Sequence, residues 1–202
     1  MSAPDLLDVS GLPTYAFGRR DPRWLAVLLL IAIESTVFGL MVFAYFYTRN
    51  RLEVWPPTAP GPRELSFGAV ILAPLLASAW TAHRVNVAAY AADLERARRW
   101  LLATTALSAT ALLLRAVEFT GLPFRWDSNA FGSLFWGVLA LHTMHLISGN
   151  IENGLFLALL YRGPIEKKHL VDLEVNGVYW YFVVFSWLPL YAIFYGGGLL
   201  AW

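Results

Sequence analysis

The chain has 202 residues, of which 58% are hydrophobic and only 14% are charged, whereas a soluble domain carries about 25% charged residues. Its net charge of +1 gives no electrostatic basis for binding nucleic acid, and the absence of cysteine excludes disulfides, thiolate metal sites and iron–sulfur clusters. Composition therefore predicts an integral membrane protein, and the nine tryptophans fit aromatic belts at two membrane interfaces.

Residues 1–23 precede the first apolar run and have no apolar core of their own. The first apolar run follows three arginines without a cleavage site, so we expect it to insert as an anchor and not as a secretory signal. Two aspartates in the segment argue against a mitochondrial presequence. We therefore expect residues 1–23 to form a cytoplasmic N-terminal segment and residues 24–202 to form one transmembrane domain.

Five stretches are long and apolar enough to cross a bilayer, which takes roughly 20 helical residues. They are Trp24–Tyr47, Leu65–Ala89, Trp100–Leu122, Ala130–Tyr161 and Gly177–Leu200. The links between them are short, polar or rich in proline and glycine. The sequence thus predicts an all-α integral membrane protein with five transmembrane helices.

The distribution of basic residues predicts the orientation of these helices. With the N-terminus inside, the inner segments carry Arg19, Arg20, Arg23, Arg84, Arg96, Arg98, Arg99, Arg162, Lys167 and Lys168, and the outer segments carry Arg49, Arg51, Arg63 and Arg125. Because Lys and Arg favour cytoplasmic loops, we expect the N-terminus in the cytoplasm and the C-terminus outside.

The first predicted helix carries Glu34 near its middle. A charged side chain in hydrocarbon costs roughly 2.5 kcal/mol or more, so such residues usually face a bundle interior, a polar cavity or a partner. Two interpretations stay open. The carboxyl is proton-accessible or bonded to a lipid headgroup, or it is an interhelical hydrogen-bonding group without a role in turnover.

The third and fourth predicted helices carry five further ionisable residues. Arg115 and Glu118 are three residues apart, a spacing that favours an internal ion pair. His142 and His145 are also neighbours on one helix surface, and Glu152 lies seven residues further on nearly the same face. These side chains form either part of a metal or haem site, which would need ligands from other helices, or a buried hydrogen-bonded stripe.

The fifth predicted helix contains an aromatic run, Tyr179-Trp180-Tyr181-Phe182, with Trp187 further along. Such a run can line a cofactor pocket, or it can pack against neighbouring helices and anchor at the membrane interface. From the residues alone, the chain is a five-span membrane protein whose polar interior indicates a proton- or lipid-related role in a larger complex.

Several short segments carry a resemblance to a known family. They are Phe43-Ala44-Tyr45-Phe46 with Trp55-Pro56-Pro57, Ala79-Trp80-Thr81-Ala82-His83, Glu118-Phe119, Phe131-Gly132-Ser133-Leu134-Phe135 before His142-Thr143-Met144-His145, and Glu174 before Tyr179-Trp180-Tyr181-Phe182-Val183 and Trp187-Leu188. In this order the chain resembles subunit III of haem–copper terminal oxidases of the cytochrome c oxidase type, in its five-helix form. It departs from the family pattern at Arg115, Tyr181 and Val184, where the family usually has Gln, His and Asp.

The resemblance implies an accessory subunit that holds no haem, copper or other metal and contains no catalytic residue. Haem and copper are then expected in partner subunits I and II, and this chain would stabilise subunit I, retain bound phospholipid and support proton uptake. It implies a proton-linked or lipid-facing role for Glu34. The expected interhelical polar network consists of Arg115, Glu118, His142, His145 and Glu152. The expected location is a bacterial inner membrane.

Alternatives remain at this point. Within the resemblance, the chain could accompany a nitric oxide reductase or a quinol oxidase. In a different class, it could be a self-sufficient membrane metalloenzyme that uses His142 and His145. A small transporter is a further alternative, but repeated halves or broken helices are typical of transporters, and no repeat is visible.

Overall fold

The computed structural model describes residues 21–57, 62–91, 93–163 and 167–196, and the description below refers to these. Their helices are α1 (Pro22–Arg49), α2 (Pro62–Tyr90), α3 (Leu94–Gly121), α4 (Ala130–Arg162) and α5 (Lys167–Phe194). Each helix is long and apolar enough to cross a membrane, and the described residues include no strand. The prediction of an all-α protein with five transmembrane helices is confirmed.

The observed helix ends differ from the apolar spans at two places. Helix α5 begins at Lys167, ten residues before the predicted start, because its polar first turns continue the helical backbone beyond the apolar stretch. Helix α3 begins at Leu94 for the same reason, with Asp93 as its N-cap. The predicted end of the last span at Leu200 and residues 1–20 of the predicted N-terminal segment lie outside the described residues.

Polar side chains fix the starts of three helices. The Asp21 carboxylate accepts from the Arg23 backbone amide at 2.9 Å, and Pro22 occupies the first helical position of α1. Hydrogen bonds from Arg23 lower the pKa of Asp21 to about 2, so this cap is ionised at neutral pH. Asn129 caps α4 in the same way by accepting from the Gly132 amide at 2.8 Å.

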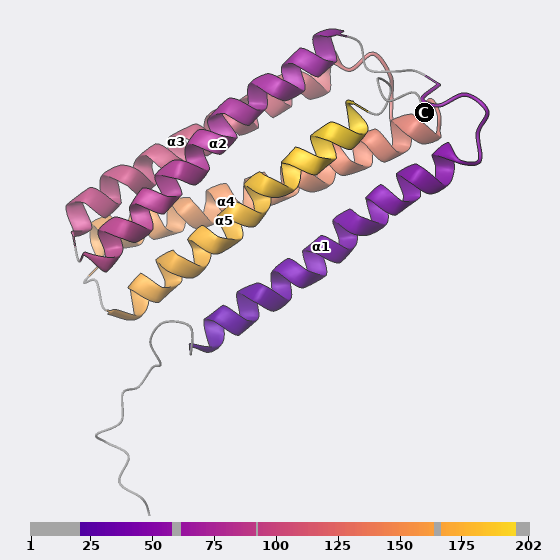
Figure 1. Ribbon diagram of the computed structural model, residues 1–202. Helices are drawn as coiled ribbons and strands as arrows, with labels where there is room; N and C mark the ends of the chain where they lie inside the picture. The colour runs from indigo at the N-terminus through magenta and orange to yellow at the C-terminus, as the bar shows by residue number, and fades with distance from the viewer. Residues whose placement is uncertain (1–20, 58–61, 92, 164–166, 197–202) are drawn as a thin grey trace, which may run out of the picture.

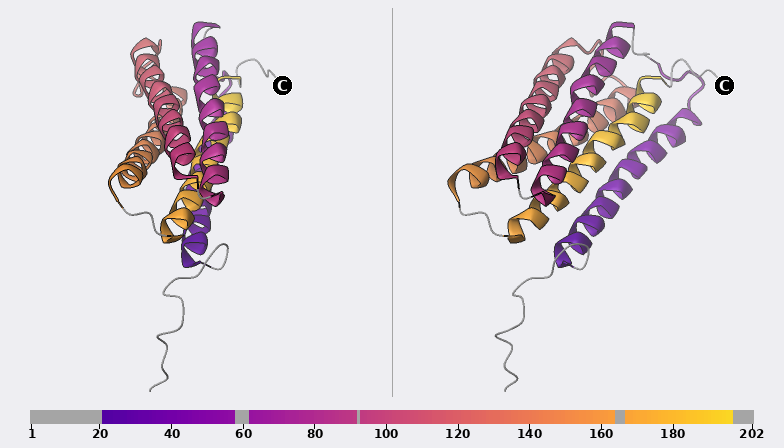
Figure 2. Two further views of the ribbon diagram at one scale, coloured as in Figure 1. Left: turned by 90° about the vertical axis from the view of Figure 1, so that its left-hand side faces the viewer. Right: turned by 60° about the vertical axis from the view of Figure 1, so that its left-hand side comes forward.

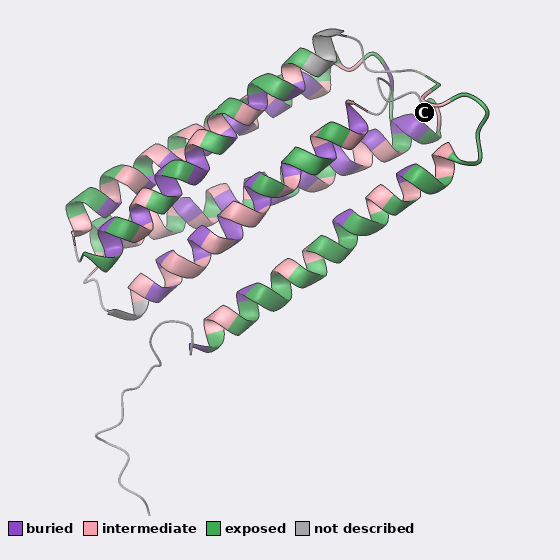
Figure 3. Ribbon diagram, in the orientation of Figure 1, coloured by how far each residue is buried: buried purple, intermediate pink, exposed green. Residues whose placement is uncertain are grey.

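The helices form a bundle in which α1 stands apart (Figure 1). Helix α2 packs against α3 and α5, α3 packs against α4, and α4 packs against α5. Helix α1 lies along α4 and α5 and buries only Val27, Phe38 and Tyr45. The two turned views in Figure 2 show the same arrangement, and most of α1 is exposed in Figure 3.

Close packing between α4 and α5 depends on Gly149. A methyl group at this position would lie 2.6 Å from the ring of Trp180, whose side chain is buried. Gly154, on the same helix, has no such neighbour within 4 Å. The absence of a side chain at Gly149 therefore lets the Trp180 ring lie directly on the α4 backbone.

We expect Gly149→Ala to lower the thermal unfolding temperature of the purified complex. Overpacking a close-packed site costs about 1–3 kcal/mol. Gly154→Ala is the matched control, and it is expected to be neutral or slightly stabilising because alanine is the better helix former. Equal unfolding temperatures for the two variants would contradict this account of the α4–α5 contact.

Candidate functional site

The central contact between α1 and the rest of the bundle joins Glu34 to His145 of α4. Nε2 of His145 lies 2.8 Å from Oε2 of Glu34, and Nδ1 lies 2.7 Å from the Leu141 carbonyl oxygen. The His145 side chain is 8% exposed and that of Glu34 is 24% exposed. The pair thus lies at the edge of the bundle, in contact with its surroundings through the carboxyl.

The hydrogen bonds fix how many protons this pair holds. A carbonyl oxygen only accepts, so Nδ1 of His145 must carry a hydrogen and donate to Leu141. Nε2 can then bond the Glu34 carboxyl only with one proton between them, either on the carboxyl or on the imidazole. The Glu34–His145 pair therefore shares one proton in this hydrogen bond.

His142 has different partners from His145 although the two are three residues apart. Its side chain is fully buried, and Nε2 lies 3.0 Å from the carbonyl oxygen of Val183 on α5, to which it donates. The imidazole lies against the ring of Trp187, with 4.7 Å between centroids. His142 thus connects α4 to α5, while His145 connects α4 to α1.

Among the residues that the structure describes, the ligands that a metal centre needs are not gathered in one place. No group of three or more His, Asp or Glu residues within the described ranges is placed to hold a metal ion. A catalytic zinc site, for comparison, takes three protein ligands and a water. Geometry therefore gives the metalloenzyme alternative no support in the part of the chain that the structure describes.

Arg115 and Glu118 form a buried ion pair on α3. The Glu118 carboxyl also accepts from the hydroxyl of Tyr195, beyond the end of α5. The Arg115 guanidinium lies 3.9 Å from the centroid of the Trp187 ring, which adds a cation–π contact. This group joins α3 to the end of α5, and the Trp187 ring contacts both Arg115 and His142.

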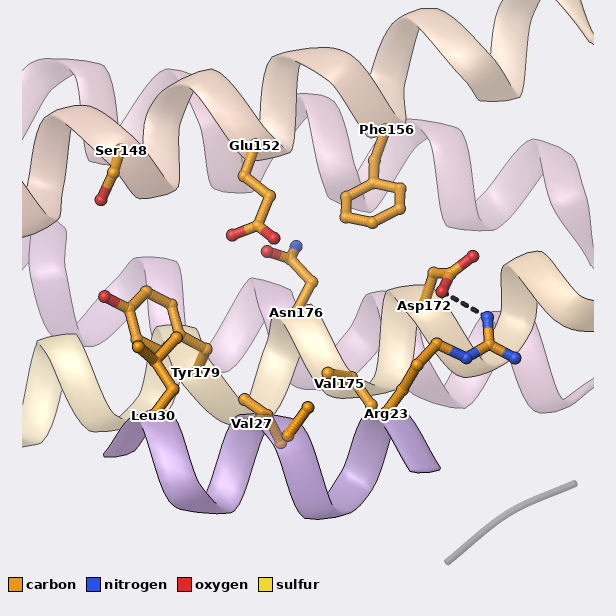
Figure 4. Close-up of a pocket in the computed structure, with 11 residues that line it drawn as sticks. Arg23, Val27, Leu30, Ser148, Glu152, Phe156, Asp172, Val175, Asn176 and Tyr179 are labelled. Carbon is orange, nitrogen blue, oxygen red and sulfur yellow. Dashed lines mark hydrogen bonds and ion pairs between the residues drawn. The ribbon is translucent and has the colours of Figure 1, made fainter. Parts of the chain in front are cut away.

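Glu152 lies apart from both histidines, in a cavity of about 450 Å³ between α1, α4 and α5 (Figure 4). The cavity is also lined by Arg23 of α1 and Asp172 of α5, which form an ion pair at 2.5 Å. The residues expected to form one interhelical network thus fall into three places. These are the buried group around Arg115, the Glu34–His145 pair, and this cavity.

The aromatic residues of α5 mostly serve packing. Trp180 is buried, and its indole nitrogen donates to the Ser78 hydroxyl of α2 at 3.0 Å. Tyr181 is partly buried in the apolar core. Tyr179 is the exception, because it lines the cavity that contains Glu152.

Sequence reasoning missed two of these contacts. Arg23 and Asp172 are 149 residues apart in the chain, and no local pattern indicates that α1 and α5 start side by side. Tyr195 follows the aromatic run of the last span, for which a pocket and a packing role both stayed open, so its bond to Glu118 was equally hidden. The sequence shows only single charged residues next to apolar runs, and this pattern does not indicate which residues pair with each other.

Comparison with known proteins agrees with the family resemblance that the sequence motifs carry. The sequence model of the family described as "Cytochrome c oxidase subunit III" matches residues 19–199. The cytochrome c oxidase subunit 3 of Yarrowia lipolytica is 31% identical over 179 residues, which cover 85% of this chain and 66% of that protein. That of Thermostichus vulcanus is 26% identical over 185 residues, 90% of either chain. A probable subunit 3 from Nocardia farcinica is 28% identical over 90% of this chain and 91% of its own.

Proposed function

Since the chain belongs to the cytochrome c oxidase subunit III family, we propose that it is the accessory subunit through which its oxidase keeps proton uptake running during sustained turnover. Family membership makes other oxidase subunits its partners. We infer that these are subunits I and II, which hold the haem and copper. The chain itself then binds no redox cofactor and supplies no catalytic residue.

The observation that carries this proposal is the Glu34–His145 pair. A carboxyl bonded to an imidazole at the edge of a bundle places a proton donor and a proton acceptor side by side where their surroundings reach them. This is the chemistry that a proton-linked role for Glu34 requires. Arg115 and Glu118 are instead paired with each other inside the bundle, and His142 bonds α5, which suits a role in holding the bundle together.

The exposed face of α1 supports the proposal that phospholipid covers this subunit. Its large apolar side chains include Leu25, Leu29, Ile33, Leu40 and Phe43, each more than half exposed. Acyl chains are the natural cover for such a face in a protein whose helices cross a membrane. With the orientation set by the Lys/Arg distribution, we place the start of α1 at the cytoplasmic side of a bacterial inner membrane.

Removal of the Glu34 carboxyl tests the proposed role. We expect Glu34→Ala to leave assembly and the haem spectrum of the purified complex intact, because the residue is partly exposed and its loss leaves no buried charge. The active lifetime of the enzyme during turnover is expected to shorten severalfold, since the shared proton is lost.

Thr36→Ala is the matched control on the same helix. Its hydroxyl only bonds the Ala32 carbonyl within α1, so its lifetime should equal that of the unmodified enzyme. Inactivation kinetics of Glu34→Ala that coincide with those of Thr36→Ala would overturn the proton-linked role. The relatives above are all described as subunits of cytochrome c oxidase, which favours this complex over a nitric oxide reductase or quinol oxidase.

A further inference from the structure

The cavity around Glu152 reaches deep into the bundle from one end. Glu152 is ten residues before the end of α4, which corresponds to about 15 Å along the helix. Figure 4 shows its carboxyl pointing toward the side chain of Asn176 on the facing helix α5, between the Arg23–Asp172 ion pair and the Ser148 and Tyr179 side chains.

The Glu152 carboxyl requires water in this cavity. In the part of the chain that the structure describes, it takes part in no hydrogen bond or ion pair, although it lies at a depth where an unsolvated carboxyl is costly. A cavity of about 450 Å³ has room for on the order of ten waters. The nearby amide oxygen of Asn176 and the hydroxyls of Ser148 and Tyr179 offer such waters further partners.

A second cavity continues from the first toward Glu34. It has a volume of about 250 Å³ and is lined by Glu34, His145, Ser148 and Tyr179. Ser148 and Tyr179 line both cavities, so the two spaces meet at these side chains. The Ser148 hydroxyl donates to the His145 carbonyl oxygen at 3.0 Å, and its oxygen can still accept a hydrogen bond from water. The Ser148 and Tyr179 hydroxyls therefore lie between Glu152 and the Glu34–His145 pair.

The other end of the larger cavity lies at the membrane face from which α1 starts. The Arg23 and Asp172 side chains there are 32% and 27% exposed, so water reaches them. Arg23 also holds the Asp21 carboxylate at 2.7 Å, so one arginine is shared by two aspartates at this mouth. The ion pair fixes the distance between the first turn of α1 and α5 and thereby keeps the mouth of the cavity in shape.

We propose that the two cavities form a hydrated proton inlet that runs from the Arg23–Asp172 mouth, through Glu152 and the Ser148–Tyr179 hydroxyls, to the Glu34–His145 pair. In each transfer, Glu152 gains one proton from water at the mouth and releases one to the water beside Ser148 and Tyr179. The Glu34–His145 pair thereby gains a second proton, which it gives up to the proton uptake of the oxidase. The inlet rests on the proposed function, which supplies the consumer of these protons.

The absence of cysteine from the chain makes a direct test of the water possible. Ser148→Cys, in the whole complex reconstituted in vesicles, is expected to react with a membrane-impermeant methanethiosulfonate applied at the face where α1 starts, and not when applied at the other face. Mass analysis of this chain reads the labelling separately from any partner cysteine. Leu155→Cys, 67% exposed on the outside of α4, and the fully buried Val138→Cys are controls expected to stay unlabelled from either face.

Labelling of Ser148→Cys no greater than that of Val138→Cys, or labelling from the opposite face, would overturn the inlet. This result does not depend on the role of Glu34, because it measures water access and not turnover. Labelling confined to the predicted face supports the inlet even if Glu34→Ala leaves the turnover lifetime unchanged.

Glu152→Gln tests the proton step. It keeps the shape of the side chain but cannot carry a proton, so it is expected to shorten the active lifetime to the same extent as Glu34→Ala. Glu95→Gln, which removes an exposed carboxyl from α3, is the control and should change nothing. A normal lifetime in Glu152→Gln beside a shortened one in Glu34→Ala would exclude the inlet and leave the proposed function standing.

Discussion

Glu118→Ala is expected to prevent the recovery of a stable complex. The carboxyl is buried and neutralises Arg115, whose side chain has no exposed surface. Its removal leaves the Arg115 charge in the bundle interior and also takes the partner of the Tyr195 hydroxyl. Breaking one half of a buried ion pair costs about 3–5 kcal/mol, which is a large part of the stability of an ordinary domain. The measurement is the yield and thermal unfolding temperature of the chain purified with its partner subunits.

Two further variants separate the effect of charge from that of packing. Asp127→Ala breaks an exposed Arg–Asp pair in the link before α4 and should leave the unfolding temperature unchanged, because exposed pairs contribute little. Arg115→Met combined with Glu118→Leu removes both buried charges and should recover much of the lost stability. If the double variant is less stable than Glu118→Ala, the cost lies in lost packing or hydrogen bonds and not in an uncompensated charge.

Trp180→Ala is expected to destabilise the bundle by about 3–5 kcal/mol, the usual cost of deleting a large buried aromatic side chain. The Trp180 ring is 1% exposed and lies on the bare backbone at Gly149. Its loss also leaves the Ser78 hydroxyl without the indole donor that ties α2 to α5. Thermal unfolding of the purified complex measures the effect.

Trp80→Ala removes the same side chain from a position that is 57% exposed on α2, where its ring makes an edge contact with Trp100. We expect a much smaller change in unfolding temperature for this control. Similar losses for the two tryptophans would mean that the α4–α5 contact contributes no more than the outer surface does.

The number and class of helices could be predicted because a span has to satisfy its own backbone in the membrane, so apolar length alone identifies it. Helix ends were less predictable, since α5 continues through polar residues such as Lys167 and Asp172 that lie outside the predicted apolar span. Local spacing is informative where both partners share a helix, as Arg115 and Glu118 do on α3.

Contacts between helices were the part that the sequence could not supply. Glu34 and His145 lie 111 residues apart, and their meeting depends on how α1 leans on α4. The fourth helix also shows why one face does not mean one network. His142 and His145 lie one turn apart, but the first turns toward α5 and the second toward α1. A single sequence gives the face of each residue, whereas its partner follows from the packing of the whole bundle.

Because α1 buries few side chains against the bundle, we expect this helix to open locally while the other helices stay packed. It buries three side chains, and it supplies both Glu34 and Arg23. Elements with few buried contacts open at the lowest free energy, so α1 should exchange its amide hydrogens before any other helix. Because Glu34 and Arg23 belong to one helix, a single displacement of α1 would break the Glu34–His145 and Arg23–Asp172 contacts together. A molecule that packs against the outer face of α1 would then act on both contacts at once.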